Sequence, residues 1–248
     1  MYQKKHSANP IPSEVQANNT EIYTSMAKNT VDPHNQLGKN PNVRFDNYNG
    51  TDMRVMFLGN SITLHSVRPE VGWFHEWGMA ASCEENDYVH LLKNAVRSCH
   101  PNAAFCVCQA ADWETVYKTG SEMMGRYSEA REFGADIIVM RLIENCSGKD
   151  FDPDAFKREL HELISYLDST GKAQVVLTTG FWHHPGDEAI ISYGAEHGLP
   201  VIILGDLGED DSMKAIGLFE HAGVANHPGD LGMKMIAERI FSVMKTYL

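Results

Sequence analysis

Residues 53–63 read Met-Arg-Val-Met-Phe-Leu-Gly-Asn-Ser-Ile-Thr, and this stretch decides how the chain folds. Its first half is an almost continuous apolar run of strand length, which is typical of a strand buried on both faces of a parallel sheet. Its second half is a turn of small polar residues. Open α/β sheets carry their chemistry at the carboxyl ends of the strands, so Ser61 is a candidate nucleophile. The alternative is that Ser61 only caps the helix that follows.

Further apolar runs of strand length follow the first, and segments with helical periodicity separate most of them. Near-continuous apolar strands that alternate with helices indicate a parallel sheet covered on both faces. We therefore predict an α/β fold, a three-layer α/β/α sandwich around a five-stranded, mostly parallel sheet. The predicted strands are Arg54–Leu58, Ala104–Cys108, Asp136–Arg141, Gln174–Thr179 and Pro200–Leu204, and the predicted helices lie near 88–97, 123–133 and 152–167 and after Asp230.

A histidine near the end of the chain is the second candidate catalytic group. His227 is followed by Pro228, which favours an extended conformation at the histidine and so places its imidazole in a loop. Asp230 is predicted to cap the helix that begins there. A serine after the first strand and a histidine before the last helix together predict a hydroxyl activated by a neighbouring base.

With Gly59, Ser61, Asn145 and His227 in this order, residues 53–248 resemble the SGNH/GDSL hydrolase family of esterases and lipases. In that family the first block is a Gly-Asp-Ser-Leu type turn, the third block ends in an Asn after a strand, and the last block has a His ahead of the terminal helix. The resemblance implies a flavodoxin-like sandwich in which Ser61 forms an acyl-enzyme, His227 takes its proton and Asn145 contributes to the oxyanion hole.

The chain departs from the family pattern in two places. Val224 stands three residues before His227, where family members usually carry an Asp, so a backbone carbonyl or an acid from elsewhere would have to orient the imidazole. The family's second sequence block usually supplies a Gly whose backbone amide helps form the oxyanion hole, and this chain has Ala111 there. An Ala amide donates as well as a Gly amide, so the resemblance implies oxyanion donors from the amides of Ser61 and Ala111 and from Asn145.

Other polar and aromatic residues also follow the predicted strands, where a substrate would bind. We expect Glu114 to pair with Arg141, because a lone buried charge is costly, and this pair to hold the Asn145 loop in place. The candidate substrate-binding residues are Trp113, Glu114, Arg141, Trp182 and His183.

The pattern favours a serine esterase that acts on small O-acyl esters, O-acetyl esters above all, and carbohydrate esters are among the candidate substrates. Tryptophans near the predicted strand ends suit stacking on sugar rings as well as ordinary packing. One alternative is a catalytically weakened, SGNH-like glycan-binding module. A flavodoxin-like nucleotide or flavin binder is disfavoured because the loop after the first strand lacks a Gly-x-Gly-x-x-Gly or Walker pattern. We expect no cofactor.

Composition limits the remaining function classes. The 248 residues are 43% hydrophobic and carry a formal net charge of −12, which argues against nucleic acid and anionic membranes as partners. No apolar run approaches the ~20 residues of a membrane span. The five cysteines are odd in number and lack zinc-site spacing, and the adjacent His183 and His184 have no nearby ligand partner, so no metal site is predicted.

The first fifty residues differ from the rest of the chain. Residues 1–50 are rich in Asn, Ser, Thr, Pro and Lys, and we expect a polar extension that is partly ordered by packing on one domain, residues 51–248. The chain does not open with the charged and then apolar pattern of a signal peptide, and both a cytoplasmic and an exported location stay open.

Overall fold

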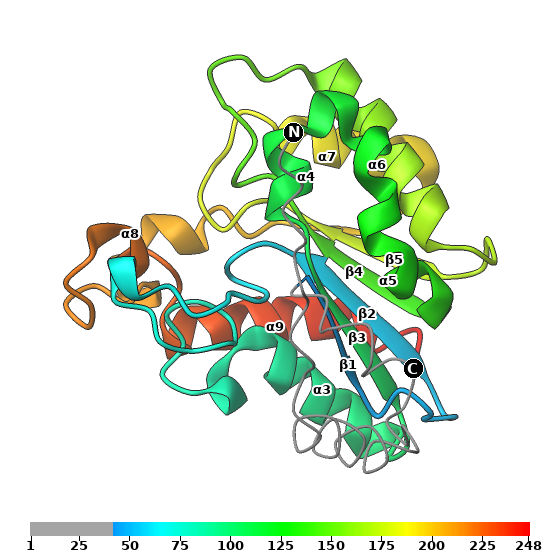
Figure 1. Ribbon diagram of the computed structural model, residues 1–248, viewed down its shortest axis with the longest axis horizontal. Helices are drawn as coiled ribbons and strands as arrows, with labels where there is room; N and C mark the ends of the chain where they lie inside the picture. Colours follow the sequence, from blue (N-terminus) through cyan, green and yellow to red (C-terminus); the bar gives the residue numbers. More distant parts are fainter. Residues whose placement is uncertain (1–41) are drawn as a thin grey trace, which may run out of the picture. The chain divides into compact units, whose positions relative to one another are not determined.

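The computed structural model describes residues 42–248, so most of the expected N-terminal extension lies outside the described residues. A six-stranded sheet in the order β1-β3-β2-β4-β5-β6 forms its centre (Figure 1). All neighbouring pairs are parallel except β1 and β3. The strands are β1 (Val43–Asp46), β2 (Arg54–Gly59), β3 (Ala104–Gln109), β4 (Ile137–Arg141), β5 (Gln174–Thr178) and β6 (Val201–Ile202).

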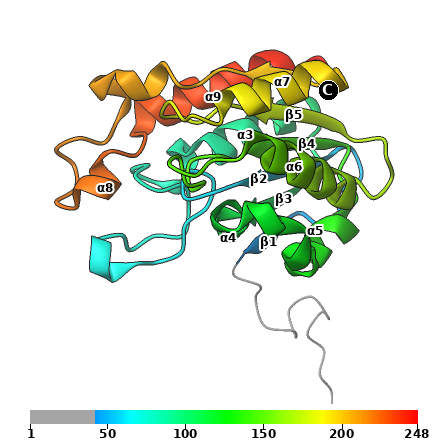
Figure 2. The same ribbon diagram turned by 90° about the horizontal axis from the view of Figure 1, so that it is seen from above.

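Helices cover both faces of this sheet, which confirms the predicted three-layer sandwich. Figures 1 and 2 show α3 and α9 on one side, with α5, α6 and α7 on the other. The α-helices are α3 (Tyr88–Cys99), α4 (Ala111–Thr115), α5 (Ser128–Phe133), α6 (Pro153–Leu167), α7 (Asp187–His197), α8 (Ala222–Ala225) and α9 (Asp230–Met244). Short 3-10 helices span Pro69–Val71, Glu84–Asn86, Tyr117–Tyr127, Leu207–Glu209 and Asp211–Met213.

Several elements differ from the sequence prediction, and three of them belong to the sheet or to the long helices that cover it. The edge strand β1 lies inside the expected extension, where only Val43 of its four residues is buried, so it has no apolar run to mark it. Helix α7 was not predicted, and its buried residues are interrupted by polar ones. The last strand is two residues long, because the chain leaves the sheet after Ile202.

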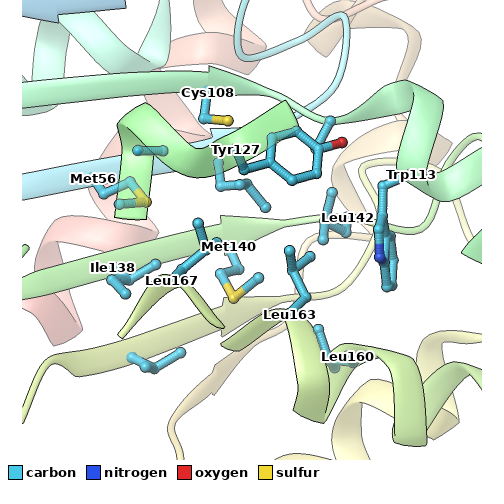
Figure 3. Close-up of a cluster of buried hydrophobic side chains, with 14 of the residues drawn as sticks. Met56, Cys108, Trp113, Tyr127, Ile138, Met140, Leu142, Leu160, Leu163 and Leu167 are labelled. Carbon is cyan, nitrogen blue, oxygen red and sulfur yellow. The ribbon is translucent and has the colours of Figure 1, made fainter. Parts of the chain in front are cut away.

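The alternation of side chains along β2 builds two cores. Val55 and Phe57 point into the core beneath α3 and α9, and Met56 and Leu58 into the core beneath α5 and α6. In the second core, α6 presents three leucines to the sheet (Figure 3). The central residues there are Leu160, Leu163, Leu167, Met56, Ile138 and Met140. Both faces of β2 are therefore buried, as its continuous apolar run predicts.

The two predicted helix starts have different outcomes. Helix α6 begins at Pro153, as predicted, and Asp152 caps it by accepting from the amides of Asp154 and Ala155. The prediction that Asp230 caps α9 is wrong, because Gly229 occupies the cap position. The Asp230 carboxylate instead accepts from the backbone amide and the hydroxyl of Ser82, at 2.8 and 2.7 Å, and from the side-chain amide of Asn86. It therefore holds the start of α9 against the segment that precedes α3.

Among residues 42–248, no helix is both long enough and apolar enough to cross a bilayer.

Gly59 ends β2 at a point with no room for a side chain. A Cβ there would overlap the Thr63 hydroxyl and lie 2.9 Å from the Arg141 carbonyl oxygen. We therefore expect Gly59→Ala to lower the free energy of unfolding by about 1–3 kcal/mol, as overpacked cores do. Urea denaturation measures this. Gly125→Ala is the control, since a Cβ at Gly125 meets nothing within 4 Å. Equal stability of the two variants would contradict the packing argument.

Candidate active site

The sheet brings Ser61 and His227 together from opposite ends of the described chain. Ser61 lies in the turn after β2, and His227 lies in the loop between α8 and α9. The Oγ of Ser61 is 2.8 Å from Nε2 of His227, and both residues are partly exposed. Pairs of nucleophile and base in hydroxyl-activating sites have this separation.

The other ring nitrogen of His227 fixes its tautomer. Nδ1 lies 2.7 Å from the backbone carbonyl oxygen of Gly223 in α8. A carbonyl oxygen can only accept, so Nδ1 carries the hydrogen and Nε2 presents its lone pair to the Ser61 hydroxyl. Of the two arrangements that the sequence left open, the structure has the backbone carbonyl.

Two of the acids near His227 in sequence bind other groups. Asp206 forms a bidentate pair with Arg239, at 2.6 and 2.7 Å, and Asp230 binds the segment before α3. Val224 is 1% exposed and packs with Trp73 and Ala215. At the position where the family usually has an Asp, this chain thus has a buried apolar residue of α8.

Burial keeps the imidazole of His227 neutral. The pKa of His227 is lowered to about 4, chiefly because the imidazole loses solvent; the hydrogen bond to Gly223 opposes this shift, and the positive charge of Arg141 adds to it. The indole of Trp182 contacts the imidazole edge to face, with 5.3 Å between ring centroids. His227 is therefore a neutral base at neutral pH.

A buried polar network lies beneath the Gly59–Ser61 turn. Asn60 is fully buried, and its side-chain amide nitrogen donates to Glu144 at 2.6 Å and to Glu114 at 3.1 Å. Its carbonyl oxygen accepts from Arg141 at 3.3 Å. Asn60 thus connects the turn that carries Ser61 to the segment that follows β4.

The carboxylate that pairs with Arg141 is Glu144, and the expected pairing with Glu114 is wrong. Both terminal guanidinium nitrogens of Arg141 contact Oε1 of Glu144, at 2.5 and 2.6 Å. Glu144 lies only three residues further on, so the turn after β4 folds it back over the guanidinium. Glu114 instead accepts from three uncharged donors, which belong to Asn60, Ile143 and Asn145. Burial and, after it, the nearby Glu144 charge raise the pKa of Glu114.

Two groups predicted as oxyanion donors already donate hydrogen bonds within the protein. The amide nitrogen of Ala111 donates to the side-chain oxygen of Gln109 at 3.1 Å. Asn145 is exposed overall, and its Nδ2 donates to Glu114 at 2.6 Å. An amide nitrogen carries two hydrogens, so Asn145 keeps one for a substrate oxygen. The oxyanion role of both residues stays a prediction.

The residues predicted to bind substrate separate into three groups. Trp113, Glu114 and Arg141 are fully buried, and Trp113 packs against Phe156 in the core beneath α6. Trp182 contacts His227, as described above. His183 is exposed, and its Nε2 lies 3.2 Å from Glu209.

Three residues of the site, Asn60, Glu144 and Gly223, are not among those predicted from the sequence. Asn60 lies between the matched residues Gly59 and Ser61, and that position is the one signal that could have identified it. Gly223 acts through its backbone, which no side-chain pattern reveals. Within residues 42–248, no group of three or more His, Cys, Asp or Glu side chains could hold a metal ion.

Searches of protein-family models and of curated proteins found no match to this chain. Solved structures do match. A two-domain esterase active on acetylated mannans, co-crystallized with mannopentaose, has a TM-score of 0.55 and 15% identity; the match covers 81% of this chain and 51% of that one. The chain thus spans about half the length of that protein.

Two further structures are similar at comparable scores. The psychrotrophic esterase EstA from Pseudoalteromonas sp. has a TM-score of 0.54 and 12% identity, with 79% of this chain and 98% of that one covered. A family two carbohydrate esterase from Clostridium thermocellum, in complex with cellohexaose, has a TM-score of 0.51 and 16% identity, with 79% and 66% covered. These similarities concern the fold: the chain has the α/β/α fold of these esterases, which is the fold that the resemblance to SGNH/GDSL hydrolases implies.

Proposed function

We propose that this protein is a serine esterase that hydrolyses small O-acyl esters, in particular O-acetyl groups on carbohydrate. The observation that carries the proposal is the 2.8 Å contact between Ser61 Oγ and the unprotonated Nε2 of His227. The carbonyl of Gly223 orients the imidazole as a carboxylate does in a Ser-His-Asp triad. The esterase fold of the structural neighbours supports the same reaction class.

The reaction follows from these positions. As Ser61 Oγ attacks the ester carbonyl carbon, its proton moves to Nε2 of His227. The tetrahedral intermediate then expels the alcohol, which receives that proton as the C–O bond breaks. A water molecule attacks the resulting acyl-enzyme, gives a proton to Nε2, and the carboxylic acid leaves with Ser61 restored. The Asn145 amide and the backbone amides of Ser61 and Ala111 would bind the oxyanion in both halves.

Two segments beside the dyad, residues 73–79 and 215–219, carry apolar side chains that suit a substrate with an apolar face. The amide of Met79 donates to the Ser61 carbonyl at 2.8 Å, and the amide of Ala215 donates to the His227 carbonyl at 2.9 Å. Trp73 and Phe219 join the two segments, with 6.0 Å between ring centroids. The same segments carry exposed apolar side chains, Phe74 at 63%, Ile216 at 53% and Leu218 at 72%. Sugar rings present apolar C–H faces to such side chains.

A glycan-binding module without hydrolytic activity is the second candidate. The engagement of the Ala111 amide by Gln109 and of Asn145 by Glu114 favours it, because neither donor is fully free for an oxyanion. The first experiment below separates the two functions.

We expect the wild-type protein to hydrolyse p-nitrophenyl acetate and acetylated oligosaccharides, and Ser61→Ala to lower kcat by at least about a thousandfold, since the acyl-enzyme can no longer form. Release of nitrophenol and of acetate measures this. Ser242→Ala on the exposed side of α9 is the control, and it should keep the wild-type rate. A protein that binds the glycan but hydrolyses neither substrate is the binding module, and equal rates for wild type and Ser61→Ala refute the proposed nucleophile.

Because the pKa of His227 is lowered, we predict that kcat/KM begins to fall only at an unusually low pH. The base works only when neutral, so kcat/KM rises as pH passes upward through its pKa. Because that pKa is lowered to about 4, the protein should keep most of its kcat/KM at pH 6, where an ordinary histidine is largely protonated. Initial rates on p-nitrophenyl acetate between about pH 4 and 8 test this, with circular dichroism as the control for folding. A limb centred near 6.5 would contradict the burial argument.

The exposed side chains of the two neighbouring segments predict a role in binding the alcohol part of the substrate. Phe74→Ser and Leu218→Ser should each raise KM for an acetylated oligosaccharide by about three- to tenfold, which corresponds to about 1 kcal/mol of lost apolar contact. KM for p-nitrophenyl acetate should rise less. Ile203→Ser is the matched control, because Ile203 is 47% exposed and its carbonyl binds Arg239 rather than the dyad. An equal effect of all three substitutions would exclude a specific contact.

A further inference from the structure

We infer that Glu114 is a positioning residue, which fixes the turn over Ile143–Asn145 and thereby aims the Asn145 side-chain amide at the oxyanion. This inference rests on the function proposed above. It assigns to Glu114 a different role from substrate binding, because its side chain is fully buried and acts through another residue.

The contacts of Glu114 place one carboxylate at the junction of three segments. Oε2 accepts from Nδ2 of Asn145 at 2.6 Å. Oε1 accepts from the backbone amide of Ile143 at 2.5 Å and from Nδ2 of Asn60 at 3.1 Å. Glu114 itself belongs to α4, which directly follows β3. Both ends of the turn after β4 and the residue next to Ser61 are therefore attached to the same carboxylate.

The turn needs such an attachment because its backbone is strained. Ile143 has a φ of 148°, a conformation that glycine adopts easily and a β-branched residue does not. Strain of this kind is unfavourable and persists only where the surrounding structure enforces it. The bond from the Ile143 amide to Glu114 supplies that constraint, two residues before Asn145.

The chemistry of a carboxylate also fixes which way the Asn145 amide faces. Both carboxylate oxygens of Glu114 accept hydrogen bonds here, and an accepting oxygen selects the NH₂ end of the amide and rejects the carbonyl end. One N–H of Asn145 points at Glu114, and the second N–H remains in the same plane as a donor for the substrate oxygen. A donor held in advance at the oxyanion position lowers the barrier, because little reorganisation is needed during the reaction.

Glu114→Gln tests this directly. Oε1 has two donors to satisfy, so the carbonyl oxygen of the new Gln takes that place and its NH₂ group faces Nδ2 of Asn145. Two donors then oppose each other, and Asn145 must turn away. We expect kcat to fall about ten- to a hundredfold, while KM changes less than about threefold, because the lost interaction acts on the transition state.

A double-mutant cycle separates positioning from a direct effect. If Glu114 acts through Asn145, then Glu114→Gln should lower kcat little further in an Asn145→Ala background. Glu114→Gln combined with Asn145→Asp restores a donor opposite an acceptor, so the thermal midpoint should recover while kcat stays low. Effects of Glu114→Gln and Asn145→Ala that multiply in kcat would overturn the inference.

Glu159→Gln is the matched control, since Glu159 is a buried glutamate of α6 that accepts from the Ser121 amide at 2.9 Å. It should lose stability without the fall in kcat. A folded Glu114→Gln protein with kcat within about twofold of wild type also overturns the inference. A crystal structure of Glu114→Gln gives a readout that needs no turnover: an unmoved Asn145 amide refutes positioning, even if the Ser61→Ala experiment has refuted the proposed esterase.

Discussion

The structure depends on how the chain accommodates buried charge where β2 and β4 end. Arg141 is completely buried at the last position of a central strand, and the side chains of Glu144 and Glu114 are buried beside it. Ions removed from water are tolerated only where each finds a partner and hydrogen bonds. Here the hydrogen bonds to the charged groups come from Asn60 after β2 and from the turn over Ile143–Asn145 after β4. The same contacts that make the charge tolerable therefore determine the positions of Ser61 and Asn145.

Continuous apolar runs and the polar residues that follow them predict most of the fold and part of the candidate site from the sequence. The central strands are predicted because both of their faces are buried, which leaves a continuous apolar signal in β2, β3 and β4. The edge strand β1 is missed because an edge strand needs little burial. Ser61 and His227 could be singled out because one follows the first predicted strand and the other precedes the last helix, so that together they indicate a hydroxyl beside a base.

The remaining features depend on geometry that the sequence does not state. Glu114 and Glu144 are both acids that follow strands, and their spacing does not say which of them reaches Arg141. The choice depends on the strained turn at Ile143, which brings Glu144 back over the guanidinium. The partner of His227 Nδ1 is a backbone carbonyl, and any residue at position 223 could supply it. Asp230 looked like a helix cap because its competing donors, Ser82 and Asn86, lie far away in sequence.

The arrangement around His227 explains why so much structure supports the oxyanion side of the proposed site. In the reaction the imidazole becomes a cation, and a carbonyl dipole stabilises that cation less than a carboxylate does. Burial and the charge of Arg141 disfavour it further. The transition state also carries negative charge on the substrate oxygen, and donors held in advance can offset the weak support for the cation. In the proposed reaction, a firmly attached Asn145 amide would be such a donor. A site with a carbonyl-oriented histidine would then rely on a firmly held turn beside the oxyanion, and the buried carboxylate of Glu114, which binds Ile143 and Asn145, would hold that turn in place.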